Sequence, residues 1–141
     1  MSDIAAAERE LVEEFQFFDN WMDRYEYLIE LGRKLPTMPE ELKTDAALLK
    51  GCQSRVWLQT TVTGDRLQFL ANSDSAIVAG LIAVLMRVYN GRRASEILAT
   101  PPAFVQAIGL DAHLSPTRSN GLRAMLEAIN KAAAAAVPAA H

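Results

Sequence analysis

The segment from Ser75 to Gly91 limits the fold more than any other part of this sequence. Nearly every position in it is apolar, and a serine at 73 or 75 can cap a helix that Gly91 ends. A helix that is apolar on all sides has to be buried. The sequence therefore predicts a central helix, whose buried residues include Ile77, Val78, Leu81, Ile82, Leu85, Val88 and Tyr89.

The residues before this helix have the pattern of two antiparallel strands. The stretch VWLQTTVT at 56–63 is rich in β-branched and aromatic residues, and Gly64-Asp65 supplies a tight turn. The returning stretch RLQFLAN places Leu67, Phe69 and Ala71 at every second position. This is the clearest hairpin in the chain.

Helices are expected on both sides of the hairpin. Asp19-Asn20 divides a short N-terminal helix from a longer one, which Gly32 and Leu35-Pro36 stop, and residues 36–50 are predicted as a loop. Thr100-Pro101 predicts the cap of a short helix that ends at Gly109, and a last helix begins near Ser115-Pro116. The fold class is therefore α+β, a small antiparallel sheet flanked by helices, in one domain over 1–141 with a frayed tail at 136–141.

Charge and hydropathy exclude two classes of partner. The net charge is -3, with acidic residues concentrated near the N-terminus, so the chain lacks the basic surface that binds nucleic acid. No apolar run approaches the roughly 20 residues that span a bilayer, and the N-terminus carries acidic residues where a secretory signal is basic. We therefore expect a cytoplasmic protein with no membrane partner.

The chain has one cysteine, Cys52, in the sequence GCQSRVWL. It follows Gly51 and precedes Gln53-Ser54, so it belongs to a turn that enters a strand rather than to an apolar stripe, although a buried structural cysteine is an equal alternative on context alone. One cysteine cannot form the Cys-X-X-Cys pair of thiol oxidoreductases, nor the several thiolates of a zinc or iron–sulfur site. No metal and no cofactor are expected.

A lone thiolate suits a sulfur carrier. It can attack the outer sulfur of a donor persulfide, whereas a second nearby cysteine would expel that sulfur while closing a disulfide. A Cys-His hydrolase would need an oriented base, for which His113 is the one internal candidate.

Four stretches in a fixed order resemble the SufE family, and the resemblance runs from about Phe18 to Ala132. They are WMDRYEYLIELGRKLP at 21–36, GCQSRVWL at 51–58, SDSAIVAGLIAVL at 73–85 and HLSPTRSNGL at 113–122. The resemblance implies a fold similar to scaffold proteins of the IscU type, with Cys52 as the persulfide acceptor. It also implies a pyridoxal-phosphate cysteine desulfurase of the SufS type as donor, which docking would stimulate, and the SufBCD scaffold as recipient in iron–sulfur cluster assembly.

Two details qualify the resemblance. The sister CsdE-like branch, which pairs with a different desulfurase, shows Gly-Cys-Glu-Asn where this chain has Gly51-Cys52-Gln53-Ser54, so the SufE branch is preferred. Relatives often carry aspartate at the position of Asn72, which changes one charge at the helix entrance but not the acceptor chemistry.

Several neighbours of the thiol are candidate supporting residues. Gly51, Gln53, Ser54 and Arg55 flank Cys52 and could contact a docked partner, or could form only a strand-entry turn. Farther along the chain, Arg118 could favour the thiolate or make an ordinary helix contact, and His113 could move a proton or simply pack. The resemblance places Asp74 at the opening of the long helix, as a cap or a partner contact.

The predicted protein is an accessory sulfur carrier and not an independent enzyme. Three other functions stay open: a CsdE-like partner of another desulfurase, a non-covalent regulatory module in which Cys52 is structural, and a cysteine hydrolase or redox sensor. Association as a homodimer is also left open.

Overall fold

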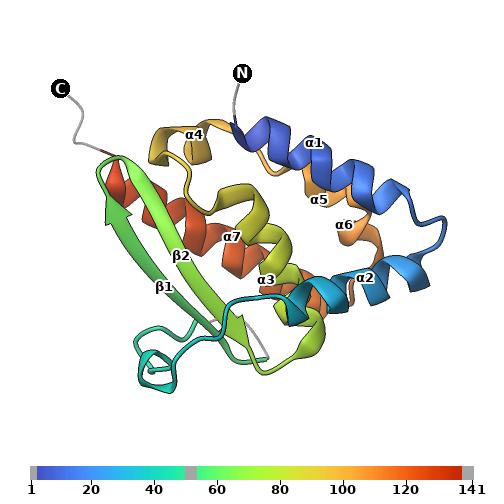
Figure 1. Cartoon of the computed structure of the whole chain (residues 1–141), viewed down its shortest axis with the longest axis horizontal. Coiled ribbons are helices and arrows are strands. Elements are labelled where there is room, and N and C mark those ends of the chain that lie inside the picture. Colours follow the sequence, from blue (N-terminus) through green and yellow to red (C-terminus); the bar gives the residue numbers. More distant parts are fainter. Residues whose placement is uncertain (1–2, 50–53, 138–141) are drawn as a thin grey trace.

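The computed structural model describes residues 3–49 and 54–137, and within them one hairpin lies along one side of a group of helices (Figure 1). The predicted α+β class, a small antiparallel sheet flanked by helices, is confirmed. The elements are α1 (Asp3–Gln16), α2 (Trp21–Arg33), the 3₁₀ turn η1 (Glu40–Leu42), β1 (Val56–Thr63), β2 (Arg66–Ser73), α3 (Ala76–Tyr89), α4 (Ala94–Ala99), α5 (Ala103–Ile108), α6 (Leu110–His113) and α7 (Pro116–Ala136).

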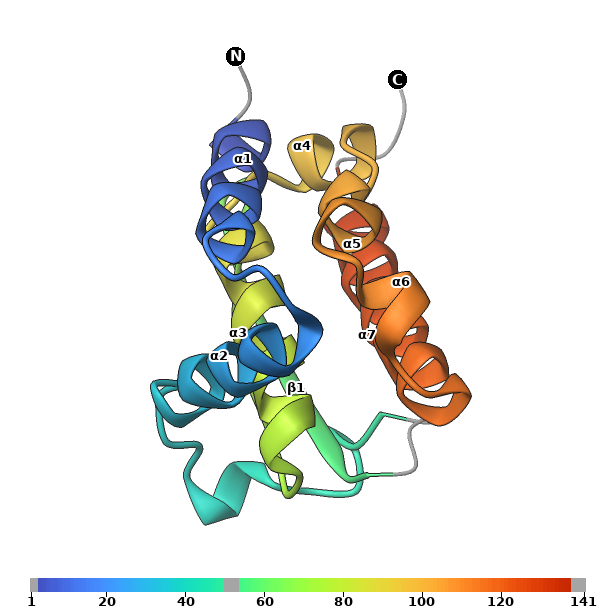
Figure 2. The same cartoon turned by 90° about the vertical axis from the view of Figure 1, so that its right-hand side faces the viewer.

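Helix α3 is the central element that its sequence predicts. Figure 2 shows it between α1 and α2 on one side and α7 on the other. Of the two candidate caps, the structure uses Ser75, whose side chain accepts a hydrogen bond from the Val78 amide at 3.4 Å. Leu81, Ile82 and Val88 are almost completely buried, as expected for a helix without a polar face.

The hairpin forms with the predicted turn. Trp57 pairs with Asn72, and Gly64 takes a φ of 64° in the turn, a left-handed conformation that glycine adopts without a side-chain clash. Leu67, Phe69 and Ala71 are buried, so alternation places one face of β2 against the helices. Val56 and Leu58 of β1 face Ile82 of α3 and Met125 of α7 around one small internal space. The hairpin therefore packs onto α3 and α7.

The crossing of α2 and α3 depends on two glycines. A Cβ atom on Gly80 would lie 2.6 Å from the carbonyl carbon of Leu28, and one on Gly32 would lie 2.6 Å from the backbone nitrogen of Gly80. The two backbones are therefore in direct contact. Gly32 lies inside α2, which ends one residue later at Arg33, so its main role is this close packing rather than stopping the helix.

Three predictions of secondary structure need correction. The first helix is not shorter than the second, because α1 has 14 residues and α2 has 13. Thr100 does not cap α5; it follows the last residue of α4, where its hydroxyl donates to the Glu96 carbonyl, and α5 starts at Ala103 without a side-chain cap. The segment predicted as a loop contains the turn η1 and a bridge between Leu48 and Trp57. The predicted end of α5 at Gly109 and the predicted cap of α7 at Ser115 are confirmed.

No helix among the described residues combines the length and the apolar character needed to cross a bilayer.

Candidate functional site

Residues 50–53 lie outside the described residues, so the structure leaves Gly51, Cys52 and Gln53 untested. The chain on both sides of this segment is described, and it is held in place. On the N-terminal side, the Leu49 amide donates to the Val56 carbonyl at 2.8 Å, and the Leu58 amide donates to the Ala47 carbonyl at 2.9 Å. Residues 47–49 therefore run antiparallel to the start of β1.

The C-terminal side is anchored at Arg55. The Arg55 amide donates to Oδ1 of Asp74 at 3.1 Å, and the Ser73 hydroxyl donates to the Arg55 carbonyl at 2.6 Å. The sequence suggested Asp74 as a helix cap, but Ser75 takes that position, and the carboxylate holds the strand entry instead. The Asp74 residue is exposed, so a partner could reach it. Its suggested contact with a partner stays a prediction.

Asn72 lies beside this anchor. Its Oδ1 accepts from the Ser73 amide at 2.8 Å, and its Nδ2 donates to the Pro36 carbonyl at 3.5 Å. An aspartate at this position has no amide group and could not donate the hydrogen bond to the Pro36 carbonyl. The asparagine therefore links the end of β2 to the segment that follows α2.

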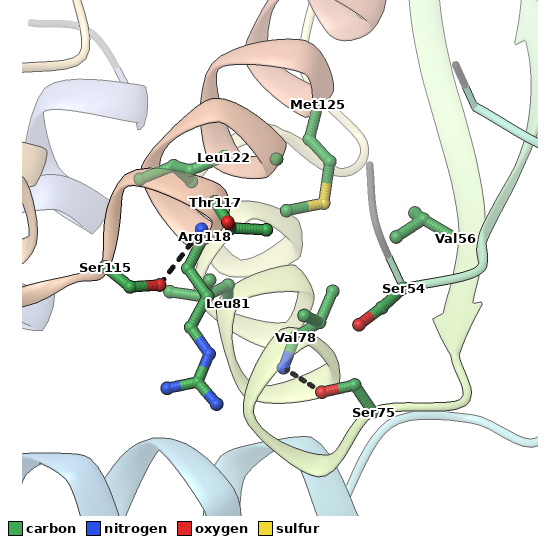
Figure 3. Close-up of a pocket in the computed structure, with 11 residues that line it drawn as sticks. Ser54, Val56, Ser75, Val78, Leu81, Ser115, Thr117, Arg118, Leu122 and Met125 are labelled. Carbon is green, nitrogen blue, oxygen red and sulfur yellow. Dashed lines mark hydrogen bonds between the residues drawn. The ribbon is translucent and has the colours of Figure 1, made fainter. Parts of the chain in front are cut away.

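A cavity of about 410 Å³ opens next to Ser54 (Figure 3). It lies where the start of β1 meets the N-terminal ends of α3 and α7. Its floor is apolar and its rim carries hydroxyl groups and one guanidinium. The lining residues are Ser54, Val56, Ser75, Val78, Leu81, Ser115, Thr117, Arg118, Gly121, Leu122 and Met125.

Arg118 supplies the positive charge of this cavity. It lies in the first turn of α7, where its amide donates to the capping Ser115 hydroxyl at 3.3 Å. Figure 3 shows its side chain extended away from α7, and its Cζ lies 5.7 Å from the centre of the Tyr25 ring on α2. Within the described ranges no carboxylate lies within ion-pair distance of Arg118. The positive charge of Arg118 therefore has no ion-pair partner among the described residues.

The structure brings Ser54 and Arg118 to one cavity and leaves His113 outside it. The imidazole of His113 stacks on Trp21, with 4.6 Å between ring centres and 13° between the planes. It therefore packs α6 against α2.

Sequence reasoning missed the hydroxyl groups of Ser75 and Thr117 in the cavity lining. The cap signal at Ser75 did mark the start of α3, which is one of the helix ends at the cavity.

Among the described residues, the carboxyl groups with clearly shifted pKa values lie away from this cavity. The Arg87 guanidinium holds the pKa of Glu14 below its usual range by charge-assisted hydrogen bonds, which the Tyr27 hydroxyl supplements. Burial raises the pKa of Glu8, partly offset by the amides of Phe104 and Ala103. In the same part of the chain, no group of three His, Cys, Asp or Glu side chains could hold a metal ion.

Comparison with known proteins places this chain among related sequences. The family model SufE, described as an Fe-S metabolism associated domain, matches residues 9–133. An uncharacterized SufE-like protein of Rhizobium meliloti is 44% identical over 135 residues, covering 92% of this chain and 96% of that protein. The sulfur acceptor protein CsdE of Escherichia coli is 45% identical over 111 residues, covering 77% of this chain and 76% of CsdE.

A solved structure supports the fold independently. The solution structure of a hypothetical protein from Thermus thermophilus matches with a TM-score of 0.75 over 92% of this chain and 95% of that chain. The two sequences are 21% identical, so this likeness shows the fold alone.

Proposed function

The chain belongs to the SufE family, and on that premise we propose that it acts as one domain that accepts sulfur on Cys52 from a cysteine desulfurase. The observation that carries the proposal is the anchoring of the chain on both sides of Cys52 next to a cavity with a guanidinium at its rim. Cys52 precedes Ser54 by two residues, and two residues span at most about 7 Å. This short separation along the chain supports the proposal that the thiol acts at the cavity.

Electrostatics at this cavity favour a thiolate. The N-terminal ends of α3 and α7 both meet there, and the N-terminus of a helix carries a partial positive charge. Arg118 adds a full positive charge. A cation and helix N-termini stabilise the deprotonated form of a nearby thiol, and the thiolate is the form that attacks a persulfide.

The transfer needs no oxidant or reductant. The Cys52 thiolate attacks the outer sulfur of the donor persulfide, a new sulfur–sulfur bond forms to Cys52, and the bond to the donor cysteine breaks. The donor leaves as a thiolate and Cys52 becomes a persulfide. The chain has no second cysteine that could attack this persulfide from within.

The resemblance to the SufE family suggests the partners for this role. The donor would be a pyridoxal-phosphate desulfurase of the SufS type, with the partner of a CsdE-like protein as the alternative, and the recipient would be the SufBCD scaffold. A reducing compartment such as the cytoplasm would keep the lone thiol ready. The protein would serve as an accessory factor that relieves the desulfurase of its persulfide, rather than as an enzyme by itself.

The test is the turnover of a SufS-type desulfurase on free cysteine, with and without this protein. The wild-type chain is expected to stimulate turnover, and Cys52→Ser is expected to abolish stimulation while still binding the enzyme. Full stimulation by Cys52→Ser would favour the non-covalent regulatory module instead. Repeating the assay with a CsdE-type donor enzyme would separate the two branches.

A further inference from the structure

A second candidate site lies on the outer surface formed by α1 and α2. Two adjoining cavities of about 570 and 500 Å³ share Phe18 and Tyr27, and together they form one elongated groove, here called the acidic groove. No residue lines both this groove and the cavity beside Ser54. Figure 2 shows α1 and α2 on the opposite side of α3 from α7.

The floor of the acidic groove is aromatic. Phe18 contacts the ring of Tyr27 at 4.9 Å and the ring of Phe17 at 5.6 Å between ring centres. Phe17, which lines the groove, is 83% exposed. Large apolar side chains left open inside a polar rim mark interaction surfaces.

The rim of the groove is acidic. Six carboxylates line it and one guanidinium, that of Arg33, accompanies them, while the whole chain has a net charge of only -3. The acidic charge of the molecule is therefore concentrated here. These carboxylates belong to Glu10, Glu13, Glu14, Asp23, Glu26 and Glu30.

Some of these carboxylates already have hydrogen-bond or ion-pair partners and others do not. Glu14 is bound by Arg87 and Tyr27, and Glu30 is paired with Arg33 at 2.5 Å. Glu13 and Glu26 are exposed, and no hydrogen bond or ion pair engages their side chains within residues 3–49 and 54–137. Glu10 is likewise exposed and unpaired among the described residues, so three carboxylates of the groove are free to receive a cation from outside.

We propose that the acidic groove binds a basic amphipathic helix of a partner protein. The aromatic floor fits apolar side chains spaced along one helix face, and Glu13 and Glu26 fit Lys or Arg at its edges. A second copy of this chain is a poor occupant, because a symmetric contact would place the same carboxylates opposite one another. An anionic membrane surface or a nucleic acid is repelled by the same charge.

The test uses a fluorescently labelled synthetic peptide of leucine and lysine whose leucines follow the helical period, titrated with the full chain and measured by anisotropy. Saturable binding that weakens with salt is expected. The charge reversal Glu13→Lys with Glu26→Lys should weaken binding about tenfold or more, and Phe17→Ser should weaken it about tenfold. All three positions are exposed, and circular dichroism checks that each variant folds.

The matched control is Asp111→Lys with Glu127→Lys, which makes the same change in net charge at exposed positions outside the groove. It should change binding by less than about twofold. The proposal is overturned if the control weakens binding as much as the groove variant, or if a peptide with glutamate in place of lysine binds equally well. Self-association of the wild-type chain that Phe17→Ser abolishes, seen by sedimentation, would also overturn it, since a second copy would then be the occupant.

Discussion

The carboxylate of Asp74 accepts a hydrogen bond from the backbone amide of Arg55, with 3.1 Å between Oδ1 and the nitrogen. These residues are 19 positions apart in the sequence, and the contact joins the link between β2 and α3 to the chain that follows Cys52. The Ser73 hydroxyl reinforces it through the Arg55 carbonyl. The strand entry is thereby held at the rim of the cavity that Ser54 lines.

Removing the carboxylate should loosen this entry. Asp74→Ala is expected to lower the free energy of unfolding by about 1 kcal/mol, because the Arg55 amide loses its acceptor while remaining partly open to water. Hydrogen exchange should accelerate at that amide. Asp74→Asn retains an Oδ1 acceptor and should exchange nearly as slowly as wild type. Equal protection of the Arg55 amide in Asp74→Ala would contradict the anchoring role.

Removing the charge of Arg118 should slow the chemistry at Cys52. Arg118→Gln is expected to reduce the rate of sulfur loading about tenfold at neutral pH, because a nearby cation favours the thiolate. Arg118→Lys should recover part of the rate. Arg123→Gln, at an exposed position of the same helix, is the matched control and should load at the wild-type rate. Unchanged loading in Arg118→Gln would leave this guanidinium a packing role only.

The helix crossing at Gly80 should not tolerate a methyl group. In an exposed helix, alanine is favoured over glycine by about 1 kcal/mol, but at Gly80 the added Cβ would meet the Leu28 backbone. Gly80→Ala is therefore expected to destabilise the protein by about 1–3 kcal/mol, measured by urea unfolding. Gly64→Asn is the control, because asparagine tolerates the left-handed turn conformation and the site is open. A Gly80→Ala protein more stable than wild type would refute the close approach.

The Glu14–Arg87 pair should make stability depend on pH. The pKa of Glu14 is lowered in the folded state, so its contribution is present above the usual pKa of 4.5 and is lost as the pH falls through the lower folded-state value. Both side chains are about one-third exposed, which limits the contribution. Glu14→Gln should therefore unfold about 1 kcal/mol more easily than wild type at pH 7 and by a smaller margin at pH 3. Glu13→Gln, with no such pair among the described residues, should show no comparable change.

Local patterns in the sequence predicted most of the fold. The Asn20, Ser75 and Ser115 caps and the Gly64-Asp65 turn depend on side chains within three residues of the positions they govern, so they can be identified without tertiary information. The short helices α4 and α6 were not predicted. They have six and four residues, too few for an apolar period to appear.

Long-range relationships could not be predicted in this way. Gly32 resembles an ordinary helix stop until α3 is placed against it, and Asp74 resembles a helix cap until Arg55 is placed beside it. Ser54 and Arg118 line the same cavity although they come from opposite halves of the chain. Cys52, by contrast, could be proposed as the acceptor from the sequence, because it is the one thiol available.

The most direct measurement is the intact mass of the protein after incubation with a SufS-type desulfurase and free cysteine, recorded without reductant. We predict a gain of one sulfur atom that a reducing agent removes and that Cys52→Ser lacks entirely. Peptide mapping after alkylation should place that atom on Cys52. An unchanged mass with an active donor enzyme, or a gain that persists in Cys52→Ser, would contradict sulfur acceptance at this residue.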